Sequence, residues 1–247
     1  MSPKSVKFAL PVLLVAPLYS WGFSYETPSI SPESESGYEE KPGWEAESFA
    51  VAAANPLATD AGYQVLKAGG NAIDAAIAVQ MVLNLVEPQS SGIGGGAFLM
   101  HFDGDEVRAY DGRETAPQGV NGELFMQDGE PLAFNDAVVS GLSVGVPGTL
   151  RMLEKAHAEH GELAWEELFT PAITLAEEGF EVSNRLHTSL TSDEFLRQDP
   201  LAKRSKTQRW QLFFAALLSK AASPCTKEPW HKTLLSAFRT TLSALVV

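Results

Sequence analysis

The side chains best suited to chemistry lie in one short stretch, Asp111-Gly112-Arg113-Glu114. It follows an apolar segment with the pattern of a β-strand, so these residues are expected at a strand end. The planar guanidinium of Arg113 can grip a carboxylate through two parallel hydrogen bonds, which would make it a clamp for a substrate carboxylate. The same side chain can form a structural salt bridge with Asp111 or Glu114, and the residue types alone favour the salt bridge.

A run of glycines, Ser90-Ser91-Gly92-Ile93-Gly94-Gly95-Gly96, comes before that strand pattern. The spacing Gly92-x-Gly94-x-x-Ala97 formally matches a dinucleotide-binding fingerprint, which requires a strand before it and a helix after it. Here a helical pattern precedes the glycines and a strand pattern follows them, so nucleotide binding is rejected. Two interpretations stay open: a tight helix-to-strand connection, or a loop that lines a site through close backbone approach and exposed amides.

The histidines and the cysteine offer less. His157 and His160 stand three apart on a predicted helix and could share a face, but no third ligand is near, so solvated helix residues are favoured over a metal site. The single cysteine, Cys225, excludes an intrachain disulfide and a multi-cysteine metal site. These residues therefore do not indicate a metal site.

The elements that position these residues follow from local signals. Phe49–Ala54 is a short apolar run that predicts a buried strand. Thr59 or Asp60 can cap a first helix that ends near Gly69-Gly70. Asn71 can cap a second helix over residues 72–86, with Asp74 in its first turn. The remaining signals predict a hairpin over 97–110 with an Asp103-Gly104 turn, an Asp128-Gly129 turn, a strand over 137–146, a helix over 149–160, and a helical stretch over 165–178 with Pro171 in its first turn. This order predicts an α+β fold or a layered αββα fold.

Charge divides the chain into two parts. Residues 1–200 carry a net charge of −20, which argues against nucleic-acid binding, whereas residues 201–247 carry +7 and a single acidic residue, Glu228. At the other end, Lys4 and Lys7 precede an apolar run over residues 8–23, which is typical of an export signal, with an uncleaved membrane anchor as the alternative. Residues 1–24 are therefore predicted as a signal or anchor and 25–48 as a linker. The chain is expected in the periplasm or outside the cell, with membrane contact only through its N-terminal segment.

Several motifs occur together in one order. They are Ala53-Ala54-Asn55-Pro56-Leu57-Ala58-Thr59, Gly69-Gly70-Asn71-Ala72-Ile73-Asp74-Ala75-Ala76, Ser91-Gly92-Ile93-Gly94-Gly95-Gly96, Asp111-Gly112-Arg113-Glu114-Thr115-Ala116-Pro117 and Val146-Pro147-Gly148. A last motif follows at Pro171-Ala172-Ile173 and Leu175-Ala176-Glu177-Glu178-Gly179-Phe180. Over residues 49–200 the chain thereby resembles the large subunit of γ-glutamyltranspeptidases.

The resemblance implies an N-terminal-nucleophile hydrolase with an αββα sandwich. In that family a proenzyme cuts itself, and the new N-terminal threonine of the small subunit attacks a γ-glutamyl amide such as glutathione, with its own amine as base. The γ-glutamyl group then passes to water or to an amino acid. The resemblance assigns Arg113 to the α-carboxylate of the glutamyl group and implies no metal or cofactor. Its implied partners are a glutathione-like γ-glutamyl substrate and the small subunit of the same precursor.

The chain departs from the family in its last part. No segment matches the small subunit, and Thr240-Thr241-Leu242-Ser243 is only a superficial match to its nucleophile, so no catalytic residue is assigned. The chain is expected to be inactive alone. The alternatives are an acylase or poly-γ-glutamate-processing relative, or a non-catalytic glutamate-binding module. Residues 201–247 are predicted to be out of frame or non-homologous, with a basic appendage around Leu212–Ser219 as the alternative.

Overall fold

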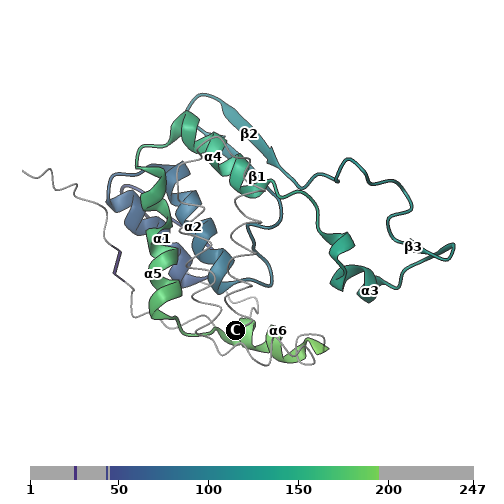
Figure 1. Ribbon diagram of the computed structural model, residues 1–247. Coiled ribbons are helices and arrows are strands. Elements are labelled where there is room, and N and C mark those ends of the chain that lie inside the picture. Colours follow the sequence, from purple (N-terminus) through teal and green to yellow (C-terminus); the bar gives the residue numbers. More distant parts are fainter. Residues whose placement is uncertain (1–24, 27–42, 44, 195–247) are drawn as a thin grey trace, which may run out of the picture.

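The computed structural model describes residues 25–26, 43 and 45–194 (Figure 1). The predicted signal over residues 1–24, the basic tail over 201–247, Cys225 and Thr241 lie outside the described residues. Within residues 25–48, Tyr25 is 8 % exposed and belongs to the buried core. Its burial, with the nearby Asp60 carboxylate as a lesser cause, raises the pKa of the phenol. In the described part of the chain no helix is both long and apolar enough to cross a membrane.

Two capped helices form the first layer. α1 (Pro56–Lys67) begins at Asn55, whose side chain accepts a hydrogen bond from the Leu57 amide, so the predicted caps Thr59 and Asp60 are wrong. Pro56 explains the earlier start, because proline fits the first position of a helix, where its missing N–H is not needed. α2 (Ala72–Val86) has the predicted bounds and the predicted Asn71 cap, which forms a reciprocal capping box with Asp74.

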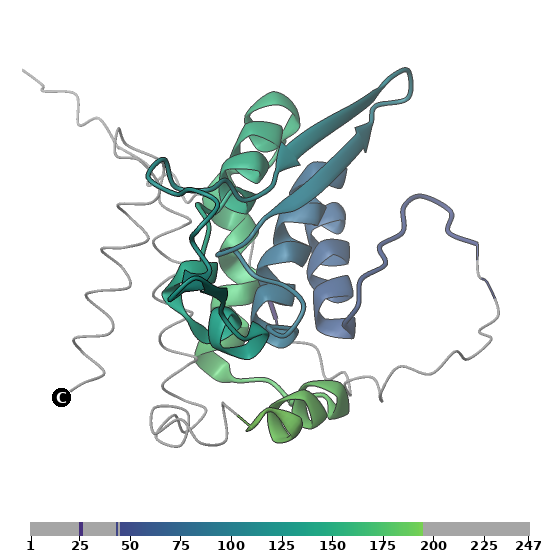
Figure 2. The same ribbon diagram turned by 90° about the vertical axis from the view of Figure 1, so that its right-hand side faces the viewer.

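The hairpin prediction is confirmed. β1 (Ala97–Phe102) and β2 (Val107–Gly112) pair antiparallel, with Ala97 opposite Gly112 and Phe102 opposite Val107. One face of this hairpin lies on α4 (Thr149–His160), whose bounds match the sequence prediction. Figure 2 shows the turn of the hairpin projecting beyond the helices. The register matters for the site, because it places Arg113 directly after the end of β2.

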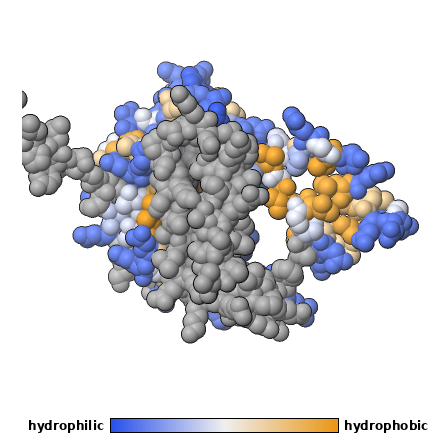
Figure 3. All heavy atoms as spheres, viewed as in Figure 1, coloured by the Kyte–Doolittle hydropathy of each residue, from blue (hydrophilic) through white to orange (hydrophobic). Residues whose placement is uncertain are grey.

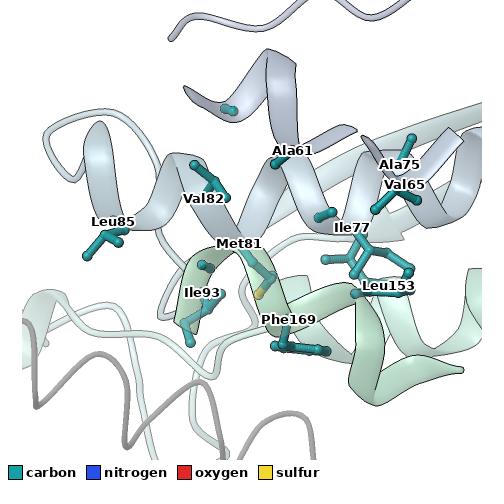
Figure 4. Packing of buried hydrophobic residues seen from close by; sticks show 14 of the residues in the cluster. Ala61, Val65, Ala75, Ile77, Met81, Val82, Leu85, Ile93, Leu153 and Phe169 are labelled. Carbon is teal, nitrogen blue, oxygen red and sulfur yellow. The ribbon is translucent and has the colours of Figure 1, made fainter. Parts of the chain in front are cut away.

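The core lies between the helices. η2 (Trp165–Phe169) and α5 (Thr170–Glu178) confirm the predicted helical stretch and pack on α2. Figure 4 shows side chains of α2, among them Ile77 and Met81, directed toward the part of the core that holds Phe169. Ile77, Met81 and Phe169 have no exposed surface, and full burial of such a side chain stabilises a fold by about 1.5–3 kcal/mol. A further helix, α6 (Asn184–Ser192), was not predicted, although Ser183 caps it.

The segment between the hairpin and α4 forms an arm. It contains β3 (Met126–Gln127), β4 (Glu130–Pro131), α3 (Phe134–Val139) and η1 (Gly141–Ser143), and Figure 1 shows it reaching away from the helices. The predicted Asp128-Gly129 turn joins β3 and β4, with φ of 53° and 85°. The predicted strand over 137–146 is wrong, because only Val146 pairs with an extended neighbour, in one bridge to Thr115.

The predicted strand over Phe49–Ala54 is also wrong. In the described part of the chain this segment pairs with no other strand. Residues 51–54 still alternate between half-buried and exposed, as a strand does, and the Phe49 ring lies 5.3 Å from that of Tyr63 on α1. The segment therefore has the pattern of a strand without a neighbour to supply the ladder of hydrogen bonds. The mixed helix and strand composition agrees with the predicted α+β class.

Candidate carboxylate-binding site at the end of the hairpin

Three segments that are far apart in sequence meet at the end of β2. They are the glycine loop, defined here as Ser91–Gly96, the residues after β2 from Asp111 to Thr115, and the entry to α4 from Val144 to Thr149. The Gly95 carbonyl accepts hydrogen bonds from the amides of Gly148 (3.1 Å) and Thr149 (3.3 Å) and from the Thr149 hydroxyl (3.0 Å). Thr115 and Val146 exchange backbone hydrogen bonds at 3.3 and 2.9 Å. These bonds fix all three segments around Arg113.

Glycine is required at this junction because backbones touch. A Cβ on Gly96 would lie 2.7 Å from both the Arg113 Cα and the Glu114 amide nitrogen. A Cβ on Gly148 would collide with the Gly112 carbonyl. The glycine loop is thus a tight helix-to-strand connection, and it also lies against the segment that carries Arg113. The interpretation as a tight connection is therefore confirmed, and the interpretation as a loop that lines a binding site stays a prediction.

Polar side chains of α2 hold the other end of the glycine loop. Asn84 is 4 % exposed, and its Oδ1 accepts the Ile93 amide at 3.0 Å. The Gln80 side chain donates to the Ser91 hydroxyl at 2.7 Å. Because Ile93 itself is buried, the loop is anchored to the helical layer by both polar and apolar contacts. The sequence analysis missed these two residues, since their role depends on how α2 meets the loop.

The sequence analysis also did not predict that the carboxylates of Glu87 and Asp74 are buried with partners from distant segments. Glu87 follows α2, is 2 % exposed, and accepts from Asn55 at 3.3 Å while lying 3.5 Å from the Arg185 guanidinium. Asp74 has no exposed surface and accepts from the amides of Glu162 and Leu163 at 3.1 and 3.2 Å. The sequence placed Asp74 in the first turn of α2, but its contacts with the loop after α4 are not local and could not be predicted from that position.

With the other described residues Arg113 makes a single ion pair, and it remains half exposed. Its Nη2 lies 3.1 Å from Oε2 of Glu114, while the side chain is 54 % exposed. Its backbone amide donates to Asp111 at 2.9 Å, and its guanidinium lies 5.9 Å from the centre of the Phe98 ring. The structural salt bridge anticipated from the sequence is therefore present with Glu114. Because the guanidinium carries five N–H donors and more than half of the side chain is exposed, the pair leaves the group accessible to a further acceptor.

The prediction that His157 and His160 are solvated is wrong. Their side chains are only 18 % and 16 % exposed, because the hairpin and the loop after α4 cover them. The His157 ring lies 2.9 Å from the Leu163 carbonyl, and the His160 ring lies 2.8 Å from the Tyr110 hydroxyl. Among the residues that the structure describes, no group of three His, Cys, Asp or Glu side chains could hold a metal ion.

Tyr110 joins the hairpin to α4. Its hydroxyl donates to Glu159 at 2.8 Å, and the centre of the His160 ring lies 4.3 Å from that of His101 on β1, with the two rings tilted by 44°. Burial, followed by the hydrogen bond to Glu159, raises the pKa of Tyr110. A cavity of about 500 Å³ lies beside this contact, between β2 and α4, and it is lined by Arg108 and Lys155 among others. Both cations face acidic neighbours, Glu106 at 2.7 Å and Glu159 at 4.0 Å.

The chain is similar in sequence to one protein family and to several curated proteins. The family described as gamma-glutamyltranspeptidase matches residues 58–238. The glutathione hydrolase proenzyme of Bacillus subtilis is 46 % identical over 144 residues, which are 57 % of this chain and 24 % of the relative. The match to the family extends to residue 238 and so includes much of residues 201–247, the segment predicted to be out of frame or non-homologous. The predicted boundary at residue 200 stays a prediction.

The chain is also similar in structure to solved gamma-glutamyltranspeptidases. The gamma-glutamyltranspeptidase of Pseudomonas nitroreducens, in complex with L-DON, aligns with a TM-score of 0.67 at 26 % identity, over 80 % of this chain and 62 % of its own. That of Helicobacter pylori aligns with a TM-score of 0.62 at 33 % identity, over 66 % and 47 %. The chain spans about a quarter of the length of the curated relatives it matches.

Proposed function

Because the chain belongs to the gamma-glutamyltranspeptidase family, we propose that it builds the part of a γ-glutamyl site that binds the substrate's α-carboxylate, with Arg113 as the binding residue. The reaction served is cleavage of a γ-glutamyl amide such as glutathione, with transfer of the glutamyl group to water or an amino acid. The observation that carries this proposal is a half-exposed guanidinium held at a junction of three fixed backbone segments.

The surroundings of Arg113 suit a carboxylate ligand. The guanidinium presents a planar set of donors, and its side chain remains 54 % exposed beside Glu114. Carboxylates prefer two parallel hydrogen bonds from arginine, which the exposed donors can supply. The Phe98 ring nearby restricts the side chain without competing for its hydrogen bonds.

We propose that a second β-sheet, from the rest of the γ-glutamyltranspeptidase polypeptide, covers the hairpin face opposite α4. That face is a row of apolar side chains at alternate positions of β1: Phe98, Met100 and Phe102 are 69, 74 and 63 % exposed. Sheets with one helix-covered face and one apolar face pack against another sheet, about 10 Å away, to form a sandwich. The αββα sandwich of this proposal would close over Arg113, since its guanidinium lies by Phe98.

The arm supports the same proposal. Its exposed apolar side chains include Phe134 at 81 %, Val144 at 63 % and Val138 at 52 %, and Figure 3 shows apolar side chains gathered on this part of the surface. Contiguous exposed apolar surface marks a place where another polypeptide binds. The nucleophile of the reaction belongs to that further polypeptide in this proposal, so the chain alone binds glutamate without turning over γ-glutamyl anilides.

Calorimetric titration of the purified chain with L-glutamate tests the proposal. Arg113→Ala is expected to weaken binding at least about tenfold, the cost of losing hydrogen bonds between charged groups. Arg108→Ala is the matched control, because Arg108 is an exposed β2 arginine paired with Glu106 and away from the junction. Equal affinities of wild type and Arg113→Ala would contradict the proposal. Turnover of a γ-glutamyl anilide that a Thr241 substitution abolishes would contradict the assignment of the nucleophile elsewhere.

We also propose that the protein is exported to the periplasm or the cell exterior, on the strength of Lys4, Lys7 and the apolar run over residues 8–23. Replacing residues 8–16 by a polar linker of the same length is expected to retain the protein in the cytoplasm. Cell fractionation with antibodies against the chain measures this, and an unchanged distribution would contradict the proposal.

A further inference from the structure

The geometry points to Glu114 as a positioning residue for Arg113. We propose that its carboxylate orients the guanidinium for ligand binding, and that Gly95, Gly96 and Gly145 form a slot that accommodates this one side chain. The proposal rests on the proposed function of Arg113, but it concerns a residue for which the sequence suggested only a salt bridge.

The slot is defined by the distances from Glu114 to a Cβ atom placed at each of the three glycines. A Cβ on Gly96 would lie 2.5 Å from Oε2 of Glu114, and a Cβ on Gly95 would lie 3.2 Å from Oε1. A Cβ on Gly145 would lie 2.9 Å from the Cβ of Glu114. Glycines from two segments, one on each side, therefore leave room for the stem and the head of the same glutamate. No side chain larger than hydrogen fits at Gly96 or Gly145 while Glu114 keeps this position.

The slot determines where the carboxylate can act. Held by the glycines, the Glu114 side chain is 31 % exposed, whereas that of Arg113 is 54 % exposed. The more buried partner thus lies against the glycine backbone, and it approaches Nη2 of the more exposed partner at 3.1 Å. An arginine side chain has about 2 kcal/mol of rotamer entropy, so a contact that restricts it before the ligand arrives lowers the cost of binding.

A competing role is chemically possible at the same place. If the Glu114 carboxylate occupied the position that the ligand carboxylate needs, removing its charge would strengthen ligand binding. The nearest atoms of the pair, Nη2 and Oε2, are 3.1 Å apart, whereas a carboxylate that fills the arginine fork makes two parallel hydrogen bonds; this favours positioning. The two roles predict opposite signs for the same substitution.

The test uses Glu114→Gln, which keeps the shape and removes the charge, and Gly145→Ala, which moves the glutamate without altering its chemistry. Glu106→Gln is the control, because it makes the same change in the exposed pair with Arg108. Melting temperatures report whether each variant folds. The direct readout is the NMR signal of the Arg113 guanidinium, which reports how far its motion is restricted. A residue that only stabilises the fold would not change this motion.

Both site variants are expected to increase the mobility of the Arg113 guanidinium and to weaken L-glutamate binding about fivefold, as fits a half-exposed ion pair. Glu106→Gln is expected to leave both unchanged. Tighter glutamate binding by Glu114→Gln, or unchanged Arg113 mobility in both site variants, would overturn the proposal. If Arg113→Ala left binding intact, the proposed function would fail instead, whereas loss in Arg113→Ala with no change in either site variant would defeat the positioning role alone.

Discussion

The helical layer and the hairpin with its arm bury their apolar side chains to very different extents. On α2, Ile77, Met81 and Val82 have no exposed surface, whereas Met100 on β1 and Phe134 on the arm are 74 and 81 % exposed. The N-termini of α1 and α2 are also capped, and the buried carboxylates of Asp74 and Glu87 have partners. The helices thus bury their apolar side chains within the described residues, whereas the exposed apolar side chains of the hairpin and arm agree with the proposal that a further polypeptide covers them.

The largest expected effect is a difference in stability between a buried side chain of α2 and an exposed side chain of the arm. Met81→Ala should destabilise the fold by about 2–5 kcal/mol, because it leaves a cavity beside the Phe169 part of the core. Phe134→Ala removes a larger side chain from the arm and should change stability by less than about 0.5 kcal/mol. Urea unfolding measures both. A loss in Phe134→Ala as large as that in Met81→Ala would show that the arm is already part of a packed core.

Asp74 gives the next largest effect. Asp74→Ala should cost about 1–3 kcal/mol, because the amides of Asn71, Glu162 and Leu163 lose their buried acceptor. Asp136→Ala, at an exposed acidic residue in the first turn of α3, should cost little. Thermal unfolding of the two variants compares a completed polar contact of the layer with an exposed charge on the arm.

Two glycines of one loop sharpen the comparison at the site. Gly96→Ala should destabilise by about 1–3 kcal/mol and weaken glutamate binding, since its Cβ would overlap the Arg113–Glu114 backbone. A Cβ on Gly94 would have no atom within 4 Å, so Gly94→Ala should leave stability and glutamate binding unchanged. Calorimetry with glutamate and thermal unfolding measure the pair, and equal behaviour of the two variants would contradict the described approach of the loop to Arg113.

The smallest expected effect lies at the joint between the two regions. The raised pKa of Tyr110 means that its neutral form stabilises the folded state, so this stability is complete below its ordinary pKa of about 10 and is lost as the pH rises through the higher folded value. The tyrosinate would then face the Glu159 carboxylate. Tyr110→Phe should flatten this alkaline loss, measured as the melting temperature between pH 8 and 11. An unchanged profile would contradict the contact between the hairpin and α4.

Prediction from the sequence succeeded where the signal was local. The start of α2 followed from Asn71 and Asp74, and the hairpin followed from Asp103-Gly104. The predictions that depended on a neighbour failed. Residues 49–54 and 137–146 have apolar patterns suited to strands, but in the described part of the chain neither has a ladder of hydrogen bonds.

The same distinction holds for the site. Arg113 could be singled out from its motif and from the family resemblance, because both are written in adjacent residues. The burial of His157 and His160 could not be predicted, since it is produced by residues of the hairpin and by the loop after α4. The slot around Glu114 likewise joins Gly95, Gly96 and Gly145, which are brought together only by the fold.

Mapping of L-glutamate binding by amide chemical shifts tests the central claim most directly, because it locates the ligand on the chain. The account predicts shifts confined to the glycine loop, residues 111–115 and residues 144–149, and their disappearance in Arg113→Ala. Shifts at the cavity lined by Arg108 and Lys155 instead, or shifts that persist in Arg113→Ala, would contradict a carboxylate site at the end of the hairpin.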